Sequence, residues 1–135
     1  MRAIELEVLV SGEASGPLLK LRESISFWGG LDPASGKIID VQHPDEGQCI
    51  RDTILLLPGI RGSTAAPGAL LECIHAGCGP SALILAESDP TPLVAVLVAQ
   101  HIGLKAFPVY SLRHAGDMNS LKSGRQVVIR DGWLS

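Results

Sequence analysis

The chain has 135 residues and a formal net charge of −3, and it is 46% apolar but only 4% aromatic. Its length fits a single domain over residues 1–135 with a core of Leu, Ile, Val and Ala. The absence of a Lys/Arg run argues against nucleic acid as a partner. The longest apolar run, 93–99, is too short to cross a membrane, and the N-terminus lacks a signal-peptide core, so we expect a cytoplasmic protein.

The first half of the chain is expected to be rich in β structure. Residues 4–10 alternate apolar and acidic side chains, which predicts a half-buried strand. A flexible loop is expected at 11–17 and a second short strand at 18–21. Residues 24–40 contain paired glycines and a Pro-Ala-Ser-Gly turn, and they predict a β-arch of two strands joined by tight turns.

The second half predicts alternating strands and helices. Near-continuous apolar strands are expected at 53–57 and 81–86, and Pro108 predicts an edge or irregular strand at 105–110. Thr91 is expected to cap a helix that is apolar nearly all round, which indicates a buried helix. This β-α-β-α-β order predicts an α/β fold with parallel strands in three layers.

The final predicted strand, at 126–134, is expected to pair with an early strand of the chain. The polar connection at 111–124 indicates no definite conformation.

The loop between the strand at 53–57 and the next helix carries the strongest chemical signal. Arg61, Gly62, Ser63 and Thr64 precede the helix, where unpaired backbone N–H groups and the helix dipole favour an anion. The Arg61 guanidinium suits a carboxylate or phosphate. The plainer interpretation is that Ser63 and Thr64 only cap the helix and that Arg61 is solvated.

The cysteines and histidines do not show the spacing of metal ligands. An odd number of cysteines without a Cys-x-x-Cys pair favours reduced thiols in a cytoplasmic chain. Each histidine is expected to be structural or exposed rather than a ligand. The residues in question are Cys49, Cys73 and Cys78, and His43, His75, His101 and His114.

Several segments in order resemble the small swivel subunit of aconitase X. They are Ser26-Phe27-Trp28-Gly29-Gly30-Leu31-Asp32, Gly36-Lys37-Ile38-Ile39-Asp40, His43-Pro44, Pro58-Gly59-Ile60-Arg61-Gly62-Ser63, Leu70-Leu71-Glu72 and the Gly-x-x-Pro-x-Ala-Leu-Ile run at 77–84. The resemblance covers roughly residues 4–110. It implies a swivelling β/β/α domain that closes over a larger partner subunit, forming a heterodimer or a larger assembly.

The resemblance also implies an activity. Related members are dehydratases that act on cis-3-hydroxy-L-proline or on mevalonate 5-phosphate, and the large partner carries an iron–sulfur cluster or a mononuclear iron. This chain is expected to bind no cofactor itself. Phe27, Trp28 and the Gly29-Gly30 turn are candidates for lining the cleft, although core packing is the plainer account of the two aromatic residues.

The family's Gly-Ser motif places its proposed proton-abstracting serine on Ser63, with Arg61 and Gly62 at the flanking positions. Thr64 begins the departure from the family pattern, which commonly continues with further serines. We expect Arg61, Gly62 and Thr64 to bind a small anionic substrate. The same groups could instead hold the substrate carboxylate and leave proton abstraction to the partner.

Two other functions remain open at this point. The chain could be a stand-alone module that holds a small anion at the Arg61-Gly62-Ser63 helix entrance. It could also be a phosphohistidine swivel domain, in which His43 or His75 would carry the phosphate, although neither follows a Gly-rich Ser-His pattern.

Overall fold

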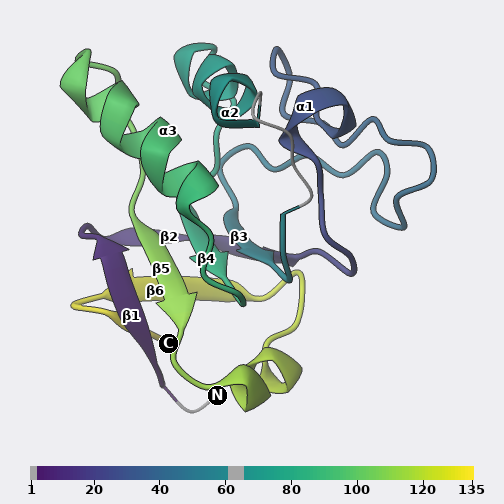
Figure 1. Cartoon of the computed structure of the whole chain (residues 1–135). Helices are drawn as coiled ribbons and strands as arrows, with labels where there is room; N and C mark the ends of the chain where they lie inside the picture. The colour runs from purple at the N-terminus through teal and green to yellow at the C-terminus, as the bar shows by residue number, and fades with distance from the viewer. Residues whose placement is uncertain (1–2, 61–65) are drawn as a thin grey trace.

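The computed structural model of the chain describes residues 3–60 and 66–135 (Figure 1). The strands are β1 (Ile4–Val10), β2 (Ala14–Lys20), β3 (Ile54–Leu57), β4 (Ala82–Leu85), β5 (Val109–Leu112), β6 (Gln126–Arg130) and β7 (Trp133–Leu134). The helices are α1 (Phe27–Gly30), α2 (Ala66–His75), α3 (Pro90–His101) and the 3-10 helix η1 (Ala115–Ser120). Within these described residues, none of the helices has the length and apolar character needed to cross a membrane.

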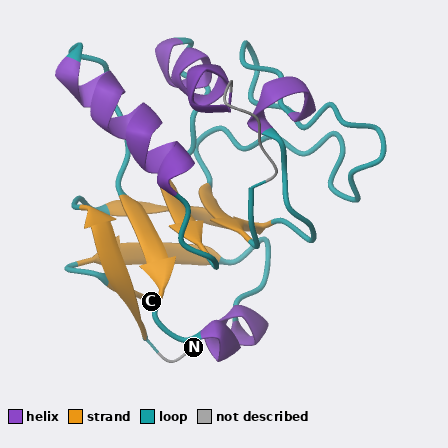
Figure 2. Cartoon of the chain, in the orientation of Figure 1, coloured by secondary structure: helices purple, strands orange, loops and turns teal. Residues whose placement is uncertain are grey.

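The strands form a closed barrel in the order β1-β5-β4-β3-β2-β6-β7, and β7 pairs back onto β1. Strands β2, β3, β4 and β5 are parallel to one another, whereas β1 pairs antiparallel with β5 and β7, and β6 pairs antiparallel with β2 and β7. The helices α2 and α3 cover the outer face of the parallel strands, and β6 and β7 lie on the other side (Figure 2). This arrangement confirms the predicted α/β class with its three layers.

The central strands are apolar along their whole length because both of their faces are covered. In β3, Leu55 and Leu57 pack in the core beneath the helices, and Ile54 and Leu56 pack in the core between the two sheets. All four side chains are at most 1% exposed. The continuous apolar run therefore follows from alternation between two cores.

Two segments next to the central strands, the predicted loop at 11–17 and the predicted strand at 105–110, differ from their predictions. β2 begins at Ala14, inside the predicted loop at 11–17, because residues 14–17 pair with β6. Pro108 lies just before β5, so the strand from Val109 keeps its hydrogen bonds to both β4 and β1. The edge alternative of the prediction was therefore wrong, since β5 lies between β1 and β4, whereas the pairing of β5 with β1 is irregular between Val8 and Val10.

The predicted β-arch at 24–40 is also wrong. Its first strand is replaced by the single turn α1, which is kinked at Trp28 and at Gly29, where φ is 85°. Asp32 then accepts hydrogen bonds from the Ala34 N–H and the Ser35 hydroxyl, at 3.0 and 2.7 Å, and these bonds stabilise the predicted Pro-Ala-Ser-Gly turn. One isolated antiparallel bridge, Leu31 with Ile38, remains of the expected hairpin.

Helix α3 differs from its prediction at its start and in its burial. Asp89, rather than Thr91, is the N-cap, and its carboxylate accepts a hydrogen bond from the Thr91 N–H at 2.8 Å. One face of the helix is buried, but Val94 and Leu97 on the outer face are 48% and 50% exposed. The helix packs on the sheet with a single face, so the prediction of a buried helix from its apolar composition was wrong for the outer face.

His43 is a structural residue, as predicted, and it fixes the irregular segment at 40–50. Its ring is buried, Nδ1 accepts a hydrogen bond from the Asp45 N–H at 3.0 Å, and Nε2 lies 3.1 Å from the Glu23 carbonyl oxygen. The ring proton therefore lies on Nε2, which donates to Glu23. The Asp45 carboxylate accepts from the backbone N–H and the Nε of Arg22, at 2.8 and 2.9 Å.

Replacing His43 by Phe is expected to lower the free energy of unfolding by about 2–4 kcal/mol, because it leaves a buried N–H and a carbonyl without partners. Urea denaturation would measure this loss. The matched change at the exposed His114 should alter stability by less than about 0.5 kcal/mol. Equal effects of the two substitutions would show that the His43 hydrogen bonds do not stabilise the fold.

Candidate active site

The loop that follows β3 lies at the carboxyl edge of the parallel strands, the end at which β2, β3 and β4 all finish. Ligand sites of open α/β sheets commonly lie at this edge. The described part of the loop is Pro58, Gly59 and Ile60, and α2 begins at Ala66. The predicted site residues Arg61, Gly62, Ser63 and Thr64 fall outside the described residues.

Residues from the neighbouring strands converge on Gly59. A Cβ at this position would lie 2.9 Å from the Ser24 hydroxyl and 3.9 Å from a Glu87 carboxylate oxygen. Ile25 donates its N–H to the Gly59 carbonyl oxygen at 3.4 Å and pairs in parallel with Ile60. A side chain at position 59 would therefore displace the Ser24 hydroxyl.

A cavity of about 530 Å³ lies between the α1 turn and the first turns of α2. Its lining includes Phe27, Trp28, Gly29, Ile39, Gly68 and Glu72. Phe27 is 1% exposed and packs in the core, as the plainer interpretation held, whereas Trp28 is 63% exposed. Gly29, but not Gly30, belongs to the lining.

Sequence reasoning missed Ser24, Glu72 and Glu87. Glu87 follows the predicted strand at 81–86, and Ser24 follows the predicted strand at 18–21. Because the carboxyl ends of adjacent parallel strands meet at one edge, the predicted topology could have placed Glu87 beside the loop. It could not have placed Ser24, since the strand at 18–21 was not predicted to join the parallel strands. Glu72 lies in the Leu70-Leu71-Glu72 segment that resembles the family, and that resemblance is the signal that could have found it.

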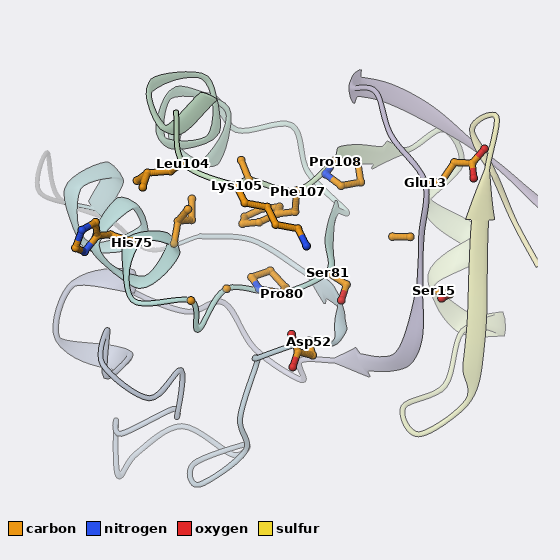
Figure 3. Close-up of a pocket in the computed structure, with 15 residues that line it drawn as sticks. Glu13, Ser15, Asp52, His75, Pro80, Ser81, Leu104, Lys105, Phe107 and Pro108 are labelled. Carbon is orange, nitrogen blue, oxygen red and sulfur yellow. The ribbon is translucent and has the colours of Figure 1, made fainter. Parts of the chain in front are cut away.

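A larger cavity, of about 670 Å³, lies at the opposite, amino edge of the strands (Figure 3). Phe107 and Pro80 contribute apolar surface, and Asp52 and Lys105 contribute charge, as the close-up shows. Both charged side chains are exposed. His75 also lines this cavity and is exposed, so it lies away from the loop after β3.

The comparisons identify the fold and the family. Residues 3–134 match the family model of the aconitase X swivel domain. The chain belongs to this family. A crystal structure of Thermococcus kodakaraensis aconitase X in its holo-form matches this swivel domain with a TM-score of 0.86 and 25% identity, covering 100% of this chain and 98% of that one.

Two kinds of named enzyme resemble this swivel domain. A cis-3-hydroxy-L-proline dehydratase of Hypocrea jecorina is 39% identical over 93% of this chain, which spans 21% of that protein. A phosphomevalonate dehydratase small subunit of Methanothermobacter thermautotrophicus is 33% identical over 71% of this chain and 73% of its own length. The chain therefore spans about a fifth of one kind of relative and most of the other.

The described donor side chains are not grouped as the ligands of a metal ion would be. Among the described residues there is no group of three or more His, Cys, Asp or Glu side chains that could hold a metal ion. All three cysteines are free thiols; Cys78 donates to the Ala34 carbonyl oxygen at 2.9 Å, and Cys49 lies 3.4 Å from that of Ser35. Cys73 is fully buried in the core.

Burial raises the pKa of the Cys73 thiol from 9.0 to about 12, and the neighbouring Cys78 adds to this shift. We expect iodoacetamide at pH 8 to label the half-buried Cys49 in the folded protein and to leave Cys73 unlabelled, since the thiolate is the reactive form. Peptide mass mapping with and without urea would measure this. Equal labelling of the two thiols in the folded state would show that burial does not protect Cys73.

The same shift predicts a loss of stability at alkaline pH. The folded chain holds the Cys73 proton more tightly than the unfolded chain. The contribution of the Cys73 thiol to the free energy of unfolding is therefore complete below pH 9 and is lost as the pH rises toward 12. A Cys73→Val variant should lack this part of the alkaline decline in urea denaturation.

Proposed function

We propose that this chain is the swivel component of an aconitase-X-type hydro-lyase, in which residues 1–135 form one domain that closes over an iron-bearing large subunit. The observation that carries the proposal is the family match over residues 3–134 together with similarity to two kinds of dehydratase. The small-subunit name of one kind of relative supports a separate large partner. On this account the iron centre, or iron–sulfur cluster, would belong to the partner and would supply the Lewis acid needed for departure of the hydroxyl group.

In this proposal Ser63 abstracts the proton next to the substrate carboxylate, and Arg61, Gly62 and Thr64 bind the substrate. A serine hydroxyl is a weak base unless its alkoxide is stabilised. The entrance of α2 and the Arg61 guanidinium would provide positive charge for that purpose in a cleft that excludes water. The described geometry supports the placement of this loop at the carboxyl edge, where Ser24 and Glu87 meet Gly59.

We favour cis-3-hydroxy-L-proline over mevalonate 5-phosphate as the substrate. The identity is 39% to the hydroxyproline dehydratases and 33% to the phosphomevalonate small subunit of M. thermautotrophicus. Charge supports the same choice, because a Glu87 carboxylate oxygen lies near Gly59, at the start of the loop. This carboxylate would repel a phosphate dianion, whereas it suits the ammonium group of an imino acid.

The test is a dehydration assay on the complex of this chain with the aconitase-X-type large subunit of the same organism, co-purified and loaded with iron under anaerobic conditions. We expect turnover of cis-3-hydroxy-L-proline and none of mevalonate 5-phosphate. Turnover of mevalonate 5-phosphate instead would reverse the substrate assignment. Failure of the two chains to form a complex would contradict the proposal and favour a stand-alone anion-binding module.

A further inference from the structure

Large apolar side chains are exposed around the α1 turn. Trp28 is 63% exposed and Ile39 is 49% exposed, and both line the 530 Å³ cavity. Val41, two residues further along the chain, is 82% exposed. We call Trp28, Ile39 and the cavity between them and α2 the α1 patch. An exposed tryptophan beside an apolar cavity is the composition found at the centre of protein interfaces.

The backbone holds Trp28 in this exposed position. The preceding Phe27 is anchored in the core, and the Ser26 hydroxyl donates a hydrogen bond to the Trp28 carbonyl oxygen at 2.7 Å. Gly29 has a φ of 85°, which reverses the chain directly after Trp28. The Ile39 N–H donates to the Gly30 carbonyl oxygen at 3.0 Å, so both sides of the patch are tied together. The tryptophan is therefore presented by a fixed turn.

The α1 patch includes the start of α2. Gly68 and Ala69, in the first turns of α2, form one wall of the cavity, and α2 directly follows the segment that carries Ser63. A partner that meets Ser63 must therefore also approach this cavity. Glu72 is the one charged residue among the described residues that line the cavity, and the others are apolar or glycine, which favours a mainly apolar occupant.

We propose that the α1 patch is the surface on which the large subunit docks, with Trp28 packed against the partner and an apolar segment of the partner seated in the cavity. This inference rests on the proposed function and adds the residues that make the contact. A second apolar surface, the outer face of α3 with Leu97, is the natural comparison. Figure 1 shows that α2 lies between α1 and α3, so the two surfaces can be tested separately.

Fluorine NMR of the chain labelled with 5-fluorotryptophan tests the contact directly. The sequence contains two tryptophans, and a Trp133→Phe variant assigns the two resonances. We expect addition of the unlabelled large subunit to shift the Trp28 resonance and to leave the chemical shift of Trp133, on the far sheet, unchanged. An unchanged Trp28 shift in a complex that forms and turns over substrate would overturn the inference and leave the proposed function standing.

Affinity measurements with matched variants complete the test. We expect Trp28→Ala to weaken binding of the large subunit by about 30-fold or more, as loss of an interface anchor does, and Leu97→Ala to change it by less than about threefold. Because the Trp28 side chain is largely exposed, its removal should leave the melting temperature of the chain unchanged. An Ile39→Lys variant provides a second disruption of the same patch and should weaken binding as well.

Three results of these measurements would overturn the inference. Trp28→Ala could raise KM while the subunit affinity stays unchanged, which would make Trp28 a substrate contact. Leu97→Ala alone could weaken the complex, which would move the interface to α3. The isolated chain could form a dimer that Trp28→Ala dissociates, which would assign the patch to a second copy. If the wild-type chains form no complex, the proposed function fails and the inference fails with it.

Discussion

Replacing Ser63 by Ala is expected to lower kcat of the assembled enzyme by about 10³–10⁴-fold. General-base catalysis contributes on the order of 10²–10⁴ to a rate, and an alanine leaves no group at this position to take the proton. The affinity of the two subunits should not change, because the substitution removes one hydroxyl oxygen from a loop outside the α1 patch. Steady-state kinetics of the purified complex, with subunit affinity measured by calorimetry, would give both quantities.

Ser15→Ala is the matched control for this prediction. It makes the same chemical change on an exposed serine that lines the cavity at the amino edge, away from the proposed site. Its kcat should equal that of the wild type. Near-normal turnover by the Ser63→Ala enzyme would remove Ser63 as the base and assign proton abstraction to the partner, with the loop after β3 holding the substrate carboxylate.

Replacing Arg61 by Lys is expected to raise KM for the substrate by about 10–100-fold. A guanidinium can donate two parallel hydrogen bonds to a carboxylate, and an ammonium on a flexible stem does not reproduce that pair although it keeps the charge. A hydrogen bond to a charged group contributes about 1.5–3 kcal/mol, which corresponds to this range. Initial-rate measurements over a wide range of substrate concentrations would separate KM from kcat.

Arg130→Lys serves as the control for the Arg61 substitution. Arg130 lies on β6, and its guanidinium is 3.8 Å from Glu13 in an exposed ion pair, so the change should alter neither KM nor stability. An Arg61→Lys enzyme with the KM of the wild type would show that Arg61 is solvated, which is the plainer interpretation of an arginine in a loop.

The central layers of the fold could be predicted from the sequence because their signals are local. The apolar runs that became β3 and β4 predict strands covered on both faces, and the structure places alternate residues in two separate cores. In the segment at 24–40 the Pro-Ala-Ser-Gly turn could be predicted, and hydrogen bonds to the Asp32 carboxylate stabilise it, but the first strand could not, since a turn kinked at Gly29 replaces it. The burial of α3 could not be predicted either, because it depends on whether another element covers the outer face of the helix, and the local sequence does not determine that.

The candidate site was predictable in part. The strand–loop–helix pattern located the loop after β3, and parallel topology placed it at the carboxyl edge. Ser24, Gly59 and Glu87 follow β2, β3 and β4, and their approach depends on the register of these three strands. The register is set by contacts between residues far apart in the sequence. Trp28 also could not be placed from the sequence. Its large aromatic side chain favoured the core, whereas the α1 turn holds it at the surface.

The dependence of dehydration on this chain tests the central claim most directly. A fixed amount of the iron-loaded large subunit would be titrated with the purified chain, and the rate of cis-3-hydroxy-L-proline dehydration measured at each point. The account predicts no turnover by either component alone and a rate that rises to a plateau at one chain per large subunit. Full activity of the large subunit without this chain would contradict it, because the proposed base and substrate-binding residues all lie in the swivel domain.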